Sequence, residues 1–124
     1  MSAGILNFIE GELEAGPAEQ GSRFLFVLTY AIDDVPVNLT GWTARMQVRT
    51  STLATDTLLD LATGSGLTLG GTAGTVTIDV PSTTMDDVPV GSHVYDLELI
   101  PAGVEANAFK LVRGTFQVVA EVTR

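Results

Sequence analysis

The sequence predicts an all-β protein: a single antiparallel β-sandwich of the Ig-like kind, with seven or eight strands and one short helix. Apolar and polar residues alternate with period 2 in four separate stretches, which is typical of half-buried strands. Residues that favour turns lie between these stretches, and no segment carries the apolar period of a long amphipathic helix. An open barrel would satisfy the same pattern.

The clearest strand is predicted at residues 42–49, after a corner at 39–41. Alternate residues from Trp42 to Val48 are apolar, and those between them are polar. Successive side chains on a strand point to opposite faces, so the apolar set shares one face. Trp42 is the only tryptophan of the chain, and we expect it to be buried at the centre of the core.

The stretch at residues 23–30 is apolar on both faces, so it is either central to a sandwich or covered by a neighbouring subunit. Asp33 and Asp34 then predict a hairpin turn. The glycines between 69 and 75 predict a second hairpin. The remaining strands are expected at residues 58–61, 67–69, 75–80, 92–99 and 108–119.

The short helix is predicted at residues 81–87, where Thr83 and Thr84 each stand three residues before an Asp, as in a capping box. Gly114 interrupts the last strand, and a glycine in mid-strand often marks a bulge.

Two parts of the chain are distinguished, an N-terminal strand or arm with an acidic loop at residues 1–19 and a β-sandwich domain at 20–124. Leu6 to Ile9 is too apolar for a free tail. It either pairs within its own domain as the first strand, or belongs to an arm that docks on a partner. The four acids between positions 10 and 19 would form a soluble tether.

Composition narrows the classes of function. The 124 residues suit one domain. There is no cysteine, which excludes disulfides and thiolate metal sites. Fifteen acids against six bases give a net charge of −9, so we expect no binding to nucleic acid or to an anionic membrane. No apolar run has the length of a membrane helix, and no signal peptide is expected.

His93 is the only histidine, and Ser92 precedes it. Neighbours on a strand point to opposite faces, so the two cannot share the hydrogen bond that activates a nucleophile. We expect a structural or surface role for His93.

The paired acids Asp33–Asp34 and Asp86–Asp87 lie in connections, where solvated carboxylates are ordinary, and no calcium-loop spacing is present. Gly70 and Gly71 lack the Lys and the helix of a phosphate loop. We therefore predict no catalytic, cofactor-binding or metal-ligating residue, and no enzyme.

Charged residues alternate on the outer faces of two predicted strands. Arg45 and Arg49 point away from Trp42, and Asp96 and Glu98 point away from Tyr95. If the two strands are neighbours, these charges pair across the sheet, which is a structural role.

The chain resembles a group of small virion-associated proteins of tailed bacteriophages and prophages. The resemblance runs from about Gln20 to the C-terminus. It rests on the Gln20–Gly21 turn, the 39–41 corner, the polar face of residues 45–49, the Gly-Thr pair before residues 75–80, and the Tyr-Asp-Leu triplet at 95–97. Its first half also resembles the N-terminal β domain of phage baseplate upper proteins.

This resemblance implies a non-enzymatic subunit of the tail, baseplate or neck, repeated in the virion and in contact with other virion proteins. Such a protein would be made in the cytoplasm of the bacterial host. A head decoration protein is the alternative within the class, and a small carbohydrate-binding β-sandwich is the alternative outside it. Aromatic residues are only 6% of the chain, and most fall on predicted core faces, which disfavours a sugar-binding platform.

Overall fold

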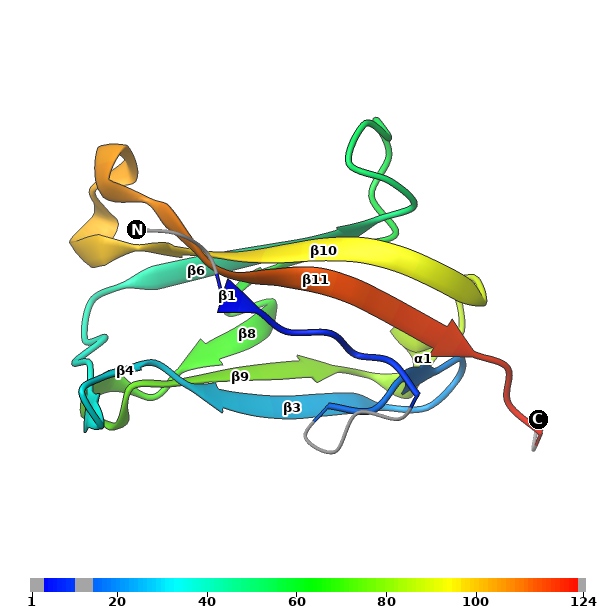
Figure 1. Cartoon of the computed structure of the whole chain (residues 1–124), viewed down its shortest axis with the longest axis horizontal. Coiled ribbons are helices and arrows are strands. Elements are labelled where there is room, and N and C mark those ends of the chain that lie inside the picture. The colour runs from blue at the N-terminus through cyan, green and yellow to red at the C-terminus, as the bar shows by residue number, and fades with distance from the viewer. Residues whose placement is uncertain (1–3, 11–14, 123–124) are drawn as a thin grey trace.

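The computed structural model describes residues 4–10 and 15–122. Within them the regular secondary structure is mostly β-strand, with one short α-helix, which confirms the all-β prediction. Nine strands form one continuous hydrogen-bonded sheet, and two more form a separate hairpin. The sheet curls so strongly that its two halves face each other as two layers (Figure 1).

Most strands follow the single path of the sheet. In spatial order they are β1 (Gly4–Ile5), β11 (Phe109–Val119), β10 (Gly91–Ile100), β6 (Thr43–Arg49), β7 (Leu59–Thr63), β8 (Gly66–Leu69), β9 (Thr75–Val80) and β3 (Phe24–Thr29). The remaining elements are β2 (Ala18–Glu19), which pairs with β11, the hairpin of β4 (Ala31–Ile32) and β5 (Val35–Pro36), helix α1 (Ser82–Met85), and 3-10 turns at Gly71–Ala73, Pro101–Gly103 and Glu105–Asn107.

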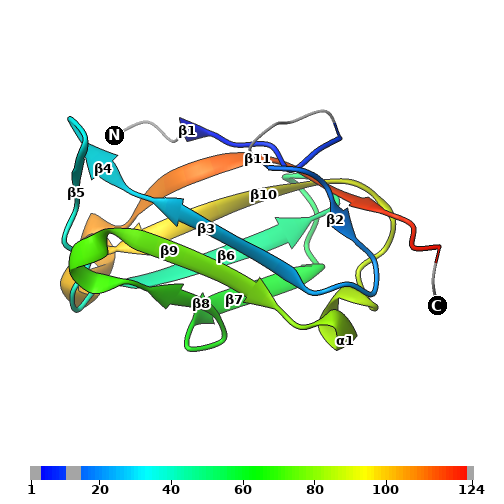
Figure 2. The ribbon, with the colours of Figure 1, turned by 90° about the horizontal axis from the view of Figure 1, so that it is seen from below.

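The sheet is mixed, whereas the sequence prediction was an antiparallel sandwich. Strands β1 and β2 run parallel to β11, and β7 runs parallel to β8. Gly64 and Gly66, both at positive φ, turn the chain between β7 and β8 from one layer into the other. One layer contains β6, β10 and β11, and the other contains β8, β9 and β3 (Figure 2). This arrangement is closer to the open-barrel alternative.

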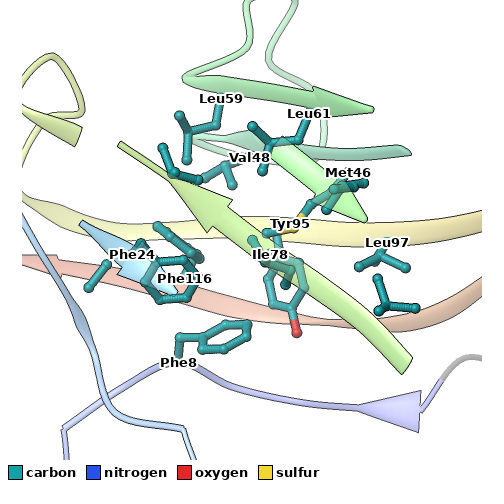
Figure 3. Close-up of a cluster of buried hydrophobic side chains, with 14 of the residues drawn as sticks. Phe8, Phe24, Met46, Val48, Leu59, Leu61, Ile78, Tyr95, Leu97 and Phe116 are labelled. Carbon is teal, nitrogen blue, oxygen red and sulfur yellow. The ribbon is translucent and has the colours of Figure 1, made fainter. Parts of the chain in front are cut away.

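The core lies between the two layers and is built from the alternate residues that the sequence predicts (Figure 3). On β6 the buried residues are Ala44, Met46 and Val48. On β9 they are Val76, Ile78 and Val80, and on β10 they include Tyr95, Leu97 and Leu99. The period-2 interpretation of these three strands is therefore confirmed.

Trp42 lies at the edge of this core, so the prediction that it is central was wrong. Its side chain is half-buried, and its ring meets Phe109 edge-on with the centroids 6.3 Å apart. The predicted corner explains the difference. Gly41 has φ of 81°, and the Trp42 N–H donates to the Leu39 carbonyl at 2.9 Å. This turn places the Leu39 side chain in the core, where it is 1% exposed, and leaves the Trp42 side chain at the edge of the core.

The described N-terminal residues belong to the same sheet. The amides of Leu6 and Phe8 donate to the carbonyls of Arg113 and Thr115 at 3.0 and 2.8 Å, and Gln117 donates back to Phe8. The Phe8 side chain is 1% exposed. Of the two interpretations left open for this segment, intradomain pairing is the one that the structure shows for residues 4–10. Residues 11–14 of the predicted acidic loop lie outside the described part.

Phe8 joins the two layers at the point where the sheet is open. Its ring lies 5.2 Å from that of Phe24 and 5.0 Å from that of Phe26 on β3. It also meets Tyr95 at 5.3 Å and Phe116 at 5.7 Å on the opposite layer. No described backbone hydrogen bond spans the gap between β11 and β3. Side-chain packing around Phe8 closes this gap instead.

The bulge in β11 lies a few residues before the predicted place. The pairing of β10 with β11 shifts between Leu97 and Glu98, which leaves Leu111 as the extra residue. Gly114 instead permits a close approach of the N-terminal strand. A Cβ on Gly114 would lie 2.5 Å from Asn7 Oδ1 and 2.9 Å from the Leu6 carbonyl carbon. The Tyr95 hydroxyl, in the residue opposite Gly114, donates to the Leu6 carbonyl at 2.6 Å.

The predicted turns and helix are present with one difference. Asp33 and Asp34 have φ of 51° and 65° in the turn between β4 and β5, which confirms the hairpin. Helix α1 lies inside the predicted 81–87 segment, but no side chain caps it. The capping role suggested by the Thr83 and Thr84 spacing was wrong, because Pro81 is the N-cap residue and both threonines lie inside the helix.

Candidate interaction surfaces

A ladder of charged side chains covers the outer face of β6, β10 and β11. Arg45 Nε donates to Glu98 Oε1 at 2.5 Å, and Lys110 Nζ donates to Glu98 Oε2 at 2.6 Å. Arg45 also reaches Glu105 at 2.7 Å. Strands β6 and β10 are neighbours, so the predicted pairing of Arg45 with Glu98 is confirmed.

The predicted pairing of Arg49 with an acidic residue of β10 was wrong. Arg49 stands opposite Val94, and its guanidinium donates to the Ala54 carbonyl and to Gln47 Oε1 at 3.0 and 2.8 Å. The register places Asp96 opposite Gln47 instead. The sequence could not reveal this, because the face of a strand residue follows from alternation but its partner depends on register.

Glu98 is the most deeply buried of the charged residues named in the ladder, with 8% of the residue exposed. Burial by itself would raise the pKa of its carboxyl. Hydrogen bonds from Lys110 and Arg45, together with their positive charges, outweigh burial and hold the pKa of Glu98 below its usual value. The ladder is therefore a structural clamp across three strands.

The two residues considered for nucleophilic chemistry point to opposite sides of β10. His93 is buried on the inner face, where Nε2–H donates to the Pro89 carbonyl at 2.7 Å. Ser92 is exposed on the outer face. The structure therefore does not bring them together, and His93 occupies a structural position at the end of the barrel.

The paired acids and the glycine segment lie in connections, as the sequence indicates. Asp33 and Asp34 form an exposed turn, and Asp86 and Asp87 follow helix α1. Gly71–Ala73 forms a 3-10 turn in the β8–β9 connection. Within residues 4–10 and 15–122, no three acidic or histidine side chains gather into a group that could hold a metal ion.

Trp42 borders an open hollow on the outside of the molecule. Leu39, Leu67 and Leu69 supply its apolar lining, and Thr40, Thr63 and Thr68 contribute hydroxyls. The Thr63 hydroxyl already bonds the backbone of Ala44 at 2.7 and 3.3 Å. No carboxylate or carboxamide lines the hollow, so it offers an apolar surface with few groups for hydrogen bonding.

Strand β3 and the hairpin after it present apolar side chains to solvent, and we call these residues the β3 surface. Leu25 and Val27 are 51% and 53% exposed on β3, and Ile32 and Val35 are 53% and 65% exposed on the hairpin. The sequence predicted a strand apolar on both faces. The structure shows that one face, with Phe24 and its alternates, meets the core and that the other stays uncovered.

The contact around Gly114 was missed by sequence reasoning. The signal was a glycine within a strand, and such a glycine marks either a bulge or the close approach of another backbone. Only the placement of Leu6 against Tyr95 decides between the two.

Compared with known proteins, the chain matches no family model and no curated protein. In the part of the chain that the structure describes, no helix combines the length and the apolar character needed to span a membrane.

Proposed function

We propose that the chain is a non-enzymatic structural subunit of a tailed-phage virion, placed in the tail, baseplate or neck and acting through protein–protein contacts. The observation that carries this proposal is the β3 surface. Four large apolar side chains on one strand and its following hairpin are about half exposed or more. These residues lie on consecutive elements of the chain, and large apolar patches on a protein surface are typical of sites that another protein covers.

The resemblance to small virion-associated phage proteins supports the same assignment. A sandwich of the Ig-like kind is the finer description of the fold that we include in this proposal. The two facing layers of the curled sheet support it, and the parallel pairs of β1 and β2 with β11 and of β7 with β8 are its departures from an antiparallel sandwich (Figure 1). The charge ladder joins three neighbouring strands of the sheet. The Phe8 contacts join the two ends of the sheet across the gap between them. Both suit a rigid building block.

The test is to follow the epitope-tagged full chain during phage production in a lysogen that encodes it. Particles would be purified by density gradient and separated into heads and tails. We expect the chain in intact particles and in the tail fraction. Recovery with isolated heads would favour the head decoration alternative, and a chain that stays wholly outside the particles would refute the virion assignment.

A carbohydrate-binding module is the second candidate, because Trp42 is accessible beside the open hollow. Sugars are bound by aromatic faces together with hydrogen-bonding side chains, and the lining provides few of the latter. A glycan array read with the parent and Trp42→Ala proteins tests it, since only a Trp42-dependent signal would support this function.

A further inference from the structure

Strand β3 forms an edge of the sheet whose outer hydrogen-bonding groups have no described strand beside them. Among the residues that the structure describes, it pairs only with β9. The Tyr30 N–H donates to the Gly74 carbonyl at 2.7 Å. In an antiparallel pair, every second residue bonds to the same neighbour, so Phe24, Phe26 and Leu28 direct their backbone groups toward β9. The residues between them, Leu25, Val27 and Thr29, therefore direct their N–H and C=O groups away from β9.

The other side of β9 gives the same assignment. The Gly70 N–H donates to the Thr75 carbonyl at 2.9 Å, so Thr75 and its alternates bond to β8, and Val76 and its alternates bond to β3. In the register, Val76 stands opposite Leu28, and Thr77 stands opposite Val27. No described backbone hydrogen bond joins the free edge of β3 to another segment.

The residues and the register of β3 itself lack the features by which edge strands commonly prevent strand addition. Natural edges are usually short, bulged, or marked by Lys or Pro. Strand β3 has six residues, Phe-Leu-Phe-Val-Leu-Thr, with no charge and no proline. Its register with β9 is unbroken from Phe24 to Thr29. A strand of this kind is a template for another strand.

We propose that two copies of the chain pair through this edge, with β3 antiparallel to β3 about a two-fold axis at Val27. This register sets Val27 opposite Val27 of the second copy, and Leu25 opposite Thr29. These are the residues whose N–H and C=O groups face outward, so each pair can exchange two backbone hydrogen bonds. The proposal builds on the assignment of the β3 surface as a contact surface and names its occupant.

Charge favours a second copy as the occupant. Each chain carries −9, so two copies repel each other over most approaches. Strands β3, β8 and β9 contain one charged residue, Asp79, and Arg23 neutralises it through bonds of 2.9 and 2.8 Å. Edge pairing of β3 therefore joins the two chains through their most nearly neutral layers.

The chain ends of β3 also match in an antiparallel pair. Arg23 precedes the strand, and the Asp33–Asp34 turn follows it. Antiparallel pairing brings the Arg23 end of each copy to the acidic end of the other. A parallel pair would instead place like charges together.

Sedimentation equilibrium of the full chain, over concentrations up to about 1 mM, tests the proposal. We expect a reversible monomer–dimer equilibrium. Val27→Lys should raise the dissociation constant at least about tenfold, because it puts two like charges opposite each other at the axis. A parent protein that stays monomeric throughout would overturn the proposal.

Thr77→Lys is the matched control, because Thr77 is the cross-strand neighbour of Val27 and lies on the same outer face of β9. It changes the net charge equally but is one strand away from the edge. We expect its dissociation constant to stay within about twofold of the parent. Equal weakening by both variants would indicate contact through the face of the layer and would refute edge pairing.

Amide hydrogen exchange on the parent protein gives a readout that needs no variant. Protection of Leu25, Val27 and Thr29 should rise with protein concentration, whereas Phe26, bonded to β9, should change little. Concentration-independent exchange at the three edge amides would contradict the proposal. Recovery in phage particles is a separate measurement. A monomeric chain that is found in tails would refute only the pairing. A dimeric chain that is absent from particles would refute only the virion role.

Discussion

At the residue scale, Gly114 and Tyr95 hold the N-terminal strand against the sheet. Gly114 leaves room for the backbone of Leu6, and the Tyr95 hydroxyl bonds the Leu6 carbonyl. Burial raises the pKa of the Tyr95 hydroxyl, so the neutral donor persists in the folded protein. Two residues on neighbouring strands thus create a seat for a segment about a hundred residues away in the chain.

Gly114→Ala is expected to lower the free energy of unfolding by about 1–3 kcal/mol, the usual range for overpacking a close contact. The added methyl would meet backbone atoms of Leu6, which cannot rotate away as a flexible side chain can. Urea denaturation measures the change. Gly16→Ala is the matched control, because nothing lies within 4 Å of its Cβ position. Equal stabilities of the two variants would show that the N-terminal strand is not seated against Gly114.

Glu98 makes the stability depend on pH in acid. Its pKa is lower in the folded than in the unfolded protein, so the stabilisation is fully present above the unfolded value of about 4.3 and is lost as pH falls through the folded value. Glu98→Gln should cost about 1–2 kcal/mol at neutral pH, a range reduced because Arg45 and Lys110 are about half exposed. It should also flatten the pH dependence below about pH 4.5.

The measurement is chemical denaturation as a function of pH, with Glu105→Gln as the control. Glu105 also binds Arg45, but its side chain is 66% exposed. Exposed ion pairs contribute little, so the control should resemble the parent protein. An acid transition that is the same in Glu98→Gln and the parent would exclude Glu98 as its source.

At the scale of elements, the N-terminal segment acts as a strand of the domain. Phe8 contacts four aromatic rings from both layers, and Trp42 contacts one, Phe109. Phe8→Ala should therefore destabilise by about 3–5 kcal/mol, as removal of a buried aromatic does. Trp42→Ala, on a half-buried side chain, should cost clearly less.

Thermal and chemical unfolding of the two variants gives the comparison. A larger loss in Trp42→Ala than in Phe8→Ala would mean that residues 4–10 do not pack in the core in solution. The same comparison bears on the arm hypothesis, because a segment that docks only on a partner would not stabilise the isolated protein.

At the scale of the whole molecule, the proposed association of two copies depends more on where the charges lie than on the net charge. Four of the six basic residues, Arg45, Arg49, Lys110 and Arg113, lie on β6 and β11, and the layer of β3, β8 and β9 is nearly uncharged. The excess of acids is therefore carried outside the layer that we propose as the contact. The net repulsion between two copies acts over longer distances, where salt screens it.

Association through β3 should consequently strengthen with ionic strength. Raising NaCl from about 0.02 to 0.5 M shortens the screening length several-fold, and the dissociation constant of the dimer should fall. Sedimentation at the two salt concentrations measures it. A dominant contribution from the opposite charges at the two ends of β3 would give the reverse dependence, so weaker association in salt would contradict this prediction and would indicate that those charges outweigh the net repulsion.

Much of the fold followed from local patterns in the sequence. The alternation in residues 42–49, 75–80 and 92–99 predicted three strands and their buried faces, because a side-chain period of 2 leaves one face for the core. The Asp33–Asp34 turn followed from residue types with strong local conformational preferences. The short helix lies in the predicted segment, but the capping pattern that suggested it is not used. The Arg45–Glu98 pair also followed once the strands were taken as neighbours.

Tertiary structure decided what depends on register and on contacts between distant segments. It set Gln47 rather than Arg49 opposite Asp96, and it placed Leu39 rather than Trp42 in the core. It also ran β1 and β2 parallel to β11 and left β3 at an edge. Alternation identifies the face of a residue but not the neighbouring strand, since hydrophobic burial is non-directional and the choice among partners is made by packing of the whole sheet.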